Sequence, residues 1–386
     1  MNKKPSLWSK NFVLSCIACF LYFGSFYLLL PTLPQYVESL GGTTSQIGIV
    51  MAALTLTSVI IRPYFGRAID THGRKAFMIF GTGLFALLFI LYGQVQSIIP
   101  LCLLRVAHGV AHGAYLAAAF AYVADLAPIE RRGEVMGVYG VSNVVAMALF
   151  PALGGMFIAH FKSFPALFLV ATAVAAGAFV STLLLSEART GERHHGPRPK
   201  LTAPLRQRTV LVASLALFSA ATLYGSVVTF LPVYAPSRGL TNIGVFFTTY
   251  AVFTLISRLV AGKMSDRFGR RKVALPFLLI VGLAAFLLPF LHSVVLLMVI
   301  GACYGLGFGA FMPALNAYVV DETPPAQRAG ALAFFTAFMD IGITTGALVL
   351  GVVGQYLGYE IMFVLGGVIV LAGATLFGLV GKAHRQ

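Results

Sequence analysis

The stretch that decides the fold is Gly66-Arg-Ala-Ile-Asp70-Thr-His-Gly73-Arg74-Lys75, a basic segment between two apolar runs. It recurs as Gly262-Lys-Met-Ser-Asp266-Arg-Phe-Gly269-Arg270-Arg271, displaced by 196 residues. The same shift relates other pairs of positions: Arg62 and Arg258, Gly109 and Gly305, Gly113 and Gly309, and Asp125 and Asp321. One constant shift between so many identities indicates that the chain contains two related halves.

Apolar segments long enough to cross a bilayer as helices surround both copies. Six lie near 11–30, 45–64, 76–95, 98–123, 134–158 and 164–185, and six more near 209–234, 241–261, 273–291, 294–320, 330–355 and 360–381. Of the 386 residues, 59% are hydrophobic and 10% are charged. A water-soluble globule has more charge and less apolar surface than this. The composition therefore excludes a soluble protein.

The net charge of +15 is explained by loop position rather than by a nucleic-acid partner. If both termini are cytoplasmic, 24 of the 27 basic residues fall in inside loops and adjoining helix ends, and two fall outside. Cytoplasmic loops of membrane proteins carry such an excess of Lys and Arg. This distribution predicts twelve crossings of a cell (cytoplasmic) membrane, with the N- and C-termini inside.

The paired G-x-x-x-D-x-x-G-R-[KR] loops resemble the signature of the major facilitator superfamily, and the resemblance covers essentially the whole chain. It implies an all-α membrane protein of twelve transmembrane helices, in two six-helix bundles related by a pseudo-two-fold along the membrane normal. The expected parts are an N-terminal bundle (1–187), a cytoplasmic linker (188–208) and a C-terminal bundle (209–386). In the family, the bundles surround one central cavity that opens alternately to either side.

In this family the signature loop helps to close the cytoplasmic side through charge contacts with neighbouring helix ends. Glycine permits the tight backbone of such a turn. The gating residues that the resemblance implies are Gly66, Asp70, Gly73, Arg74, Asp125, Arg132, Asp266, Gly269 and Arg270. The alternative is that these charges only anchor the orientation of the chain in the membrane.

A polar stripe runs along the fourth apolar segment. Arg105, His108 and His112 are spaced i, i+3, i+7, which places them on one helical face close to Tyr115. Arginine within a span is costly unless it is paired or faces water. The segment is similar to a family motif associated with proton coupling in exporters, so we predict a proton-coupling role for Arg105, His108 and His112. The alternative is that these side chains are satisfied within the bundle.

Asp340 is the only acidic residue of the C-terminal half that lies away from a segment end. A carboxylate there is expensive unless it is protonated, paired or hydrated. We therefore predict that Asp340 serves proton coupling or acts as a counter-charge for the substrate. A neutral, hydrogen-bonded packing role is the alternative.

The fifth apolar segment resembles the G-x-x-x-G-P-x-x-G-G motif of antiporter branches of the family. Pro151, Gly154 and Gly155 match, whereas Ala146 and Phe150 stand where glycines are usual. Polar and aromatic residues on the segments that line the family's cavity are candidates for contacting substrate: Tyr22, Tyr27, Tyr115, Asn143, Tyr224 and Tyr304.

These features predict a secondary active transporter, a proton-coupled exporter (antiporter) of a drug-like compound or a metallophore. The alternative is a proton-coupled importer (symporter) of a sugar or an organic acid, and a non-transporting receptor is a more distant third. No catalytic motif, cofactor site or metal-ligand spacing occurs in the sequence, so neither an enzyme nor a cofactor is expected. The expected partners are the substrate, protons and lipid, and we expect a monomer.

Overall fold

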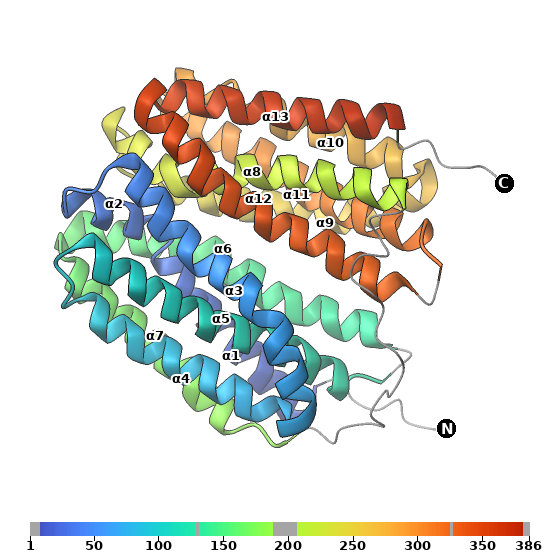
Figure 1. Cartoon of the computed structure of the whole chain (residues 1–386), viewed down its shortest axis with the longest axis horizontal. Helices are drawn as coiled ribbons and strands as arrows, with labels where there is room; N and C mark the ends of the chain where they lie inside the picture. The colour runs from blue at the N-terminus through green and yellow to red at the C-terminus, as the bar shows by residue number, and fades with distance from the viewer. Residues whose placement is uncertain (1–7, 129–130, 188–206, 325–326, 381–386) are drawn as a thin grey trace. The chain divides into compact units, whose positions relative to one another are not determined.

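The computed structural model describes residues 8–128, 131–187, 207–324 and 327–380, apart from the side chains of residues 67, 70, 132, 133 and 329. Residues 188–206 of the expected linker therefore lie outside this description. The elements in chain order are α1 (Lys10–Leu28), α2 (Thr32–Ser39), α3 (Thr44–His72), α4 (Arg74–Tyr92), α5 (Ile98–Leu126), α6 (Arg132–Phe161), α7 (Phe164–Leu183), α8 (Arg208–Ser237), α9 (Gly244–Phe268), α10 (Arg270–Ala285), η3 (Leu288–Phe290), α11 (Val294–Asp321), α12 (Arg328–Leu357) and α13 (Tyr359–Val380). The described chain is thus all-helical, as the sequence predicts (Figure 1).

Contacts divide the chain into two compact units. The described part of the first lies within Met1–Thr32 and Ala53–His195, and that of the second within Leu33–Ala52 and Gly196–Gln386. In the first unit α1 packs on α6 and α7, and α4 packs on α5 and α7. In the second unit α8 packs on α12 and α13, and α11 packs on α9 and α10. Figure 1 shows α4, α5 and α7 running side by side in blue to green.

The segment Leu33–Ala52 belongs to the second unit through specific contacts. The Gln35 side-chain amide donates to the carbonyl of Pro232 over 2.9 Å. The hydroxyl groups of Thr44 and Tyr359 lie 3.1 Å apart and share a hydrogen bond. Helix α2 and the start of α3 are therefore held by polar contacts to α8 and α13.

The repeat of the sequence is also a repeat of helix boundaries. Helices α3 and α9 end at His72 and Phe268, and α6 and α12 begin and end 196 residues apart. Between α3 and α4 stands Gly73 with φ of 90°, and between α9 and α10 stands Gly269 with φ of 94°. A side chain is strained at such a φ, so glycine is required at both turns. We call the end of each unit that carries this glycine its motif end, and the opposite end its far end.

Close helix contacts repeat as well. Gly109 and Gly113 of α5 bring that helix against the backbone of α3, where a β-carbon would meet Leu54 and Ser58. Their counterparts Gly305 and Gly309 bring α11 equally close to Tyr250 and Thr254 of α9. Small residues allow helices in membranes to approach in this way. The two units thus share one framework of contacts.

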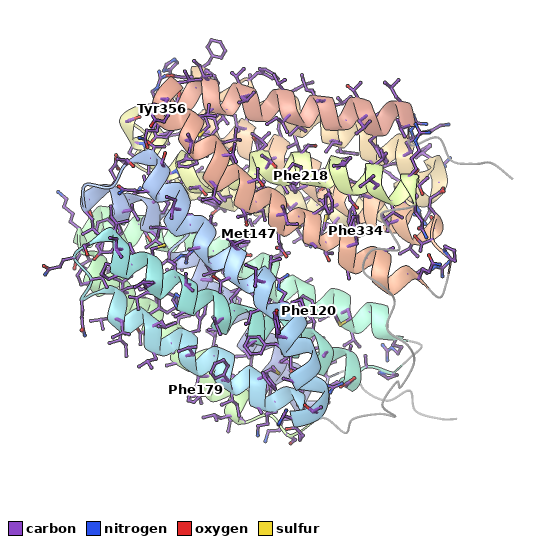
Figure 2. The ribbon with its side chains drawn as sticks, in the orientation of Figure 1. Phe120, Met147, Phe179, Phe218, Phe334 and Tyr356 are labelled. Atoms are coloured by element: carbon purple, nitrogen blue, oxygen red, sulfur yellow. The ribbon has the colours of Figure 1, made fainter. Side chains whose placement is uncertain are left out.

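Eleven helices of the described residues are long and apolar enough to cross a membrane. The segment expected at 273–291 differs, because α10 ends at Ala285 and a 3₁₀ turn follows at Leu288–Phe290. Pro289 lies in this turn and, having no backbone N–H, cannot extend the helix through it. Large apolar side chains such as Phe120 and Tyr356 are exposed on the units (Figure 2), as expected for surfaces that contact lipid.

Candidate functional site

An ion pair joins two helices at the motif end of each unit. In the first unit the Arg74 Nε donates to the Asp125 carboxylate over 3.0 Å, and its Nη1 donates to the carbonyl of Ile69 over 3.2 Å. In the second unit the Arg270 Nε donates to the Asp321 carboxylate over 3.0 Å. The predicted pair of Asp125 with the signature loop is therefore present, and the 196-residue shift identifies Asp321 as its counterpart.

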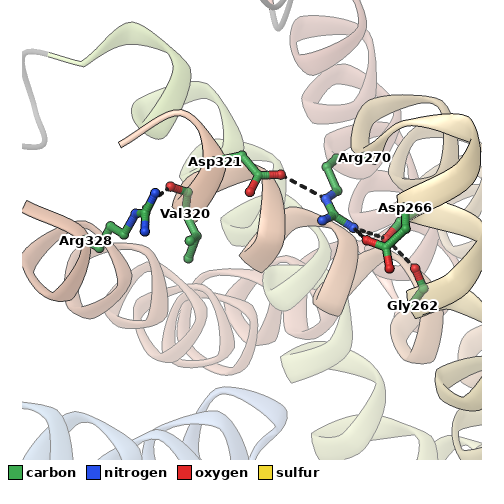
Figure 3. A network of polar contacts seen from close by, with 7 residues as sticks. Gly262, Asp266, Arg270, Val320, Asp321 and Arg328 are labelled. Atoms are coloured by element: carbon green, nitrogen blue, oxygen red, sulfur yellow. Dashed lines mark hydrogen bonds and ion pairs between the residues drawn. The ribbon is translucent and has the colours of Figure 1, made fainter. Parts of the chain in front are cut away.

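Arg270 is held by more than one partner (Figure 3). Its Nη1 also pairs with Asp266 and donates to the Ser265 hydroxyl. The Asp321 carboxylate raises the pKa of the Arg270 guanidinium above its ordinary value by hydrogen bonding to it. Arg328 donates to the carbonyls of Val320 and Thr323, which caps the end of α11. These contacts tie α9, α10, α11 and α12 together at one end of the unit.

The other predicted gating residues have different surroundings. Gly66 has open space where a β-carbon would stand. The side chains of Asp70 and Arg132 lie outside the described residues. Arg131, beside Arg132, pairs with Glu134 over 2.9 Å at i, i+3. Glu134 was not among the predicted gating residues.

The polar stripe of α5 is buried within the first unit. Arg105, His108, His112 and Tyr115 are 4%, 0%, 8% and 0% exposed. Arg105 interacts with Tyr92 at the end of α4. Arg105 and His112 lie seven positions apart, which is about 10 Å along the helix. The stripe therefore extends from near the far end of α5 toward its middle.

His108 has hydrogen bonds at both ring nitrogens. Its Nε2 lies 3.0 Å from the carbonyl of Phe85, which can only accept, so Nε2 carries the hydrogen. Its Nδ1 lies 2.7 Å from the Tyr92 hydroxyl, which donates to it. This arrangement ties α5 to α4 and fixes the tautomer of His108.

Tyr92→Phe is expected to destabilise the first unit, because it leaves the His108 Nδ1 buried without its donor. An unsatisfied buried acceptor costs about 1–3 kcal/mol, so the melting temperature of the purified protein should fall. Tyr64→Phe is the matched control, since Tyr64 is 67% exposed. Equal melting of Tyr92→Phe and wild type would contradict the bond.

His112 lies in an aromatic cluster of the first unit. Its Nδ1 is 3.0 Å from the Tyr22 hydroxyl, and its ring stacks on Phe26 at 5.5 Å between centroids. Tyr22 stacks in turn on Tyr115 at 3.9 Å. The structure thus brings together three predicted residues from α1 and α5.

Arg62 of α3 belongs to the same surroundings, although the sequence analysis noted it only as part of the repeat. It acts electrostatically on Tyr22 and on His112, as Arg105 does on His112. Two guanidinium groups therefore act on one imidazole. No spacing in the sequence reveals this, because it depends on how α3 packs against α5.

The remaining aromatic candidates lie in two places. In the first unit the Tyr27 hydroxyl donates to the Asn143 side-chain carbonyl over 3.4 Å. In the second unit Tyr224 packs on Tyr250 and Phe308, at 5.8 and 5.0 Å between ring centroids. Tyr304 is fully buried, and its hydroxyl makes no hydrogen bond to a described residue.

Asp340 occupies the middle of α12 and is half-buried. Its backbone carbonyl accepts a hydrogen bond from the Thr344 hydroxyl over 2.9 Å. Two residues later, Gly342 packs against the backbone of Phe218, so α12 is close to α8 here. The other carboxyl groups of the second unit lie within a few residues of helix ends.

The residues of the antiporter-like motif lie where α6 meets α1. Pro151 is buried inside α6. A β-carbon on Gly154 would meet the Leu28 carbonyl, and one on Gly24 would meet the Phe150 ring. Gly155 is the next residue of α6 and is half-buried. Gly154 therefore allows a close approach of two helices.

Comparison with known sequences finds one family. The sequence model of the Major Facilitator Superfamily matches residues 15–246 and 239–385. A protein of Enterobacter lignolyticus named "Multidrug resistance protein MdtG" is 27% identical over 392 residues, covering 97% of this chain and 93% of that protein. Its namesake from Escherichia coli is 25% identical over 394 residues, covering 98% and 95%.

Solved structures share the fold at low identity. A mutant of the nucleoside transporter NupG superposes with a TM-score of 0.82 at 16% identity, covering 96% of this chain and all of that chain. A bacterial homologue of the human lysosomal transporter Spinster gives 0.80 at 14% identity, covering 98% of both. The human organic anion transporter MFSD10 gives 0.70 at 19% identity, covering 97% and 100%.

Proposed function

Because the chain belongs to the Major Facilitator Superfamily, we propose that it is a proton-coupled exporter of small organic molecules that works by alternating access. The observation that carries the proposal is the likeness, over nearly its whole length, to proteins named for multidrug resistance. The chain is accordingly a multi-pass membrane transporter, and the direction and coupling of transport are the proposed part.

The proposed arrangement is that of two six-helix bundles, related by a pseudo-two-fold along the membrane normal. The motif ends face the cytoplasm, as do both termini, and the membrane is the cell (cytoplasmic) membrane. The equal spacing of helix boundaries and of glycine contacts in the two units supports this arrangement. The transporter acts as a monomer.

Two groups carry the proposed coupling of protons to substrate. Asp340 is a carboxyl group in the middle of α12, where ionisation is costly unless water or a partner reaches it. Arg105 is the buried cation of α5, with His112 on the same helical face. The satisfied ring nitrogens of His108 favour a supporting role for that residue.

The ion pairs at the motif ends are the proposed gating elements. Each pair, Arg74 with Asp125 and Arg270 with Asp321, joins the start of one helix to the end of another. We propose that they stabilise one conformation of the cytoplasmic side. Partly exposed ion pairs contribute only a little free energy each. They therefore shift the equilibrium between conformations and do not fix the protein in one of them.

Efflux from intact cells tests the proposal. Cells that produce the protein should accumulate less of a fluorescent drug-like probe than cells that produce Asp340→Asn, in a panel of anionic, neutral and cationic probes. A protonophore should remove the difference. Greater accumulation in producing cells would favour the importer alternative, and efflux that persists with the protonophore would contradict proton coupling.

A further inference from the structure

One face of α9 is exposed along most of the helix and changes from apolar to basic toward the motif end. Val252, Ile256 and Leu259 are 45%, 48% and 72% exposed. Lys263 and Arg267 follow and are also exposed. The spacing i, i+4, i+7, i+11, i+15 places all five residues on the same side of the helix. An apolar stripe on a surface that contacts lipid therefore leads directly to two cations.

The two cations are not neutralised by nearby carboxylates. The acids Asp266 and Asp321 of this motif end both pair with Arg270. Among the side chains that the structure describes, neither Lys263 nor Arg267 forms an ion pair. The Arg267 guanidinium lies over the ring of Phe268, 5.4 Å from its centroid. Stacking of this kind uses none of the guanidinium N–H groups, so they remain available to an acceptor.

The second cation is not part of what the repeat conserves. The shift of 196 residues places Leu56 and Ile60 of α3 at the positions of Val252 and Ile256. Both are exposed, so the apolar stripe occurs in the first unit as well. At the position of Arg267, however, stands Thr71, whose hydroxyl donates to the Ala68 carbonyl of its own helix. The turn of the signature loop therefore forms without a cation there.

We propose that Lys263 and Arg267 bind the phosphate of an anionic phospholipid, whose acyl chain lies along Val252, Ile256 and Leu259. Lys and Arg bind phosphate oxygens with charge-assisted hydrogen bonds. Four residues, about 6 Å of helix, separate Leu259 from Lys263. One lipid can therefore contact the apolar stripe with its chain and the two cations with its headgroup. Phe268, which is 53% exposed, suits the boundary between chains and headgroups.

Lipid binding to the purified protein tests the inference. The probes are dioleoylphosphatidylglycerol, which is anionic, and dioleoylphosphatidylcholine, which has the same chains and no net charge. Native mass spectrometry of the delipidated protein should show the first phosphatidylglycerol binding at least about tenfold more tightly than the first phosphatidylcholine. Equal affinities would overturn the inference and would leave the two cations a role in orienting the chain only.

Variants locate the site on α9. Lys263→Gln combined with Arg267→Gln should lower the ratio of the two affinities at least about fivefold, and Lys263→Arg combined with Arg267→Lys should retain it. Lys162→Gln combined with Arg258→Gln is the matched control, because it also removes one Lys and one Arg, both exposed. Lys162 follows α6 at the far end of the first unit, and Arg258 lies on another face of α9. An unchanged ratio in the first variant, or an equal loss in the control, would contradict the site.

The chain-free headgroup separates a lipid site from a site for a soluble phosphate ester. Glycerophosphoglycerol should bind at least about tenfold more weakly than the phospholipid, because it cannot contact the apolar stripe. Equal binding of the two would contradict a lipid site. The inference requires only that the chain is a membrane protein, so the loss of proton-driven efflux in the cell assay would leave it standing. Likewise, equal lipid affinities would leave the proposed export intact.

Discussion

Asp340→Asn is expected to abolish uphill transport and to leave downhill exchange intact. The amide has nearly the size of the carboxyl group and neither binds nor releases a proton near neutral pH. For one proton exchanged, a pH gradient of one unit sustains about tenfold accumulation of substrate. The variant should therefore reach a ratio near one in the same gradient, and substrate preloaded on one side should still exchange with substrate on the other.

Two comparisons make this result specific to Asp340. Asp340→Glu keeps an ionisable carboxyl group on α12 and should retain part of the accumulation. Glu360→Gln removes a carboxyl group that pairs with Arg238 near the start of α13, and it should transport as wild type does. Full accumulation by Asp340→Asn would assign coupling to another group, and loss of exchange as well would indicate a structural role.

Arg74→Asp is expected to lower the transport rate about tenfold, and the double variant Arg74→Asp with Asp125→Arg to restore most of it. The single change puts two carboxylates where an ion pair of 3.0 Å joins α4 to α5. A tenfold effect corresponds to about 1.4 kcal/mol. Replacing the attraction of an ion pair with the repulsion of two carboxylates can supply that much. Transport rates should be compared at equal amounts of protein in the membrane.

Arg131→Asp is the control for this exchange of charges. It makes the same change of net charge at the same end of the first unit, and the pair of Arg131 with Glu134 lies within one helix start, at i, i+3. Its effect should be small, because surface pairs of this kind contribute about 0.2–1 kcal/mol. If Arg131→Asp slows transport as much as Arg74→Asp, the loops act through net charge. If the double variant stays slow, the pair is not a gate.

The repeated signature loop allowed much of the fold to be predicted. The shift that relates Arg74 to Arg270 and Asp125 to Asp321 also relates the ends of α3 and α9 and the two ion pairs. Such features depend on local sequence: a glycine at positive φ, a charge at a helix end and an apolar run of fixed length. The 3₁₀ turn around Pro289 and the short helix α2 were not predicted, because they depend on where a span stops within an apolar run.

The individual residues of the candidate site could be predicted from the sequence, but the contacts between them could not. The spacing of Arg105, His108 and His112 places them on one face of α5, and all three are buried. The partners could not be predicted: the Tyr22 hydroxyl for His112, and the Phe85 carbonyl for His108. These contacts depend on the register between helices, which the pattern of a single helix does not specify. A carbonyl partner in particular has no side-chain signature.

The measurement that tests the account most directly is substrate accumulation by inverted membrane vesicles in an imposed pH gradient, with the membrane potential held at zero. If the protein is a proton-coupled exporter, vesicles with an acidic interior concentrate the substrate, and an ionophore exchanging K⁺ for H⁺ releases it. Accumulation only when the interior is alkaline, or accumulation that survives collapse of the gradient, would contradict a proton-coupled exporter.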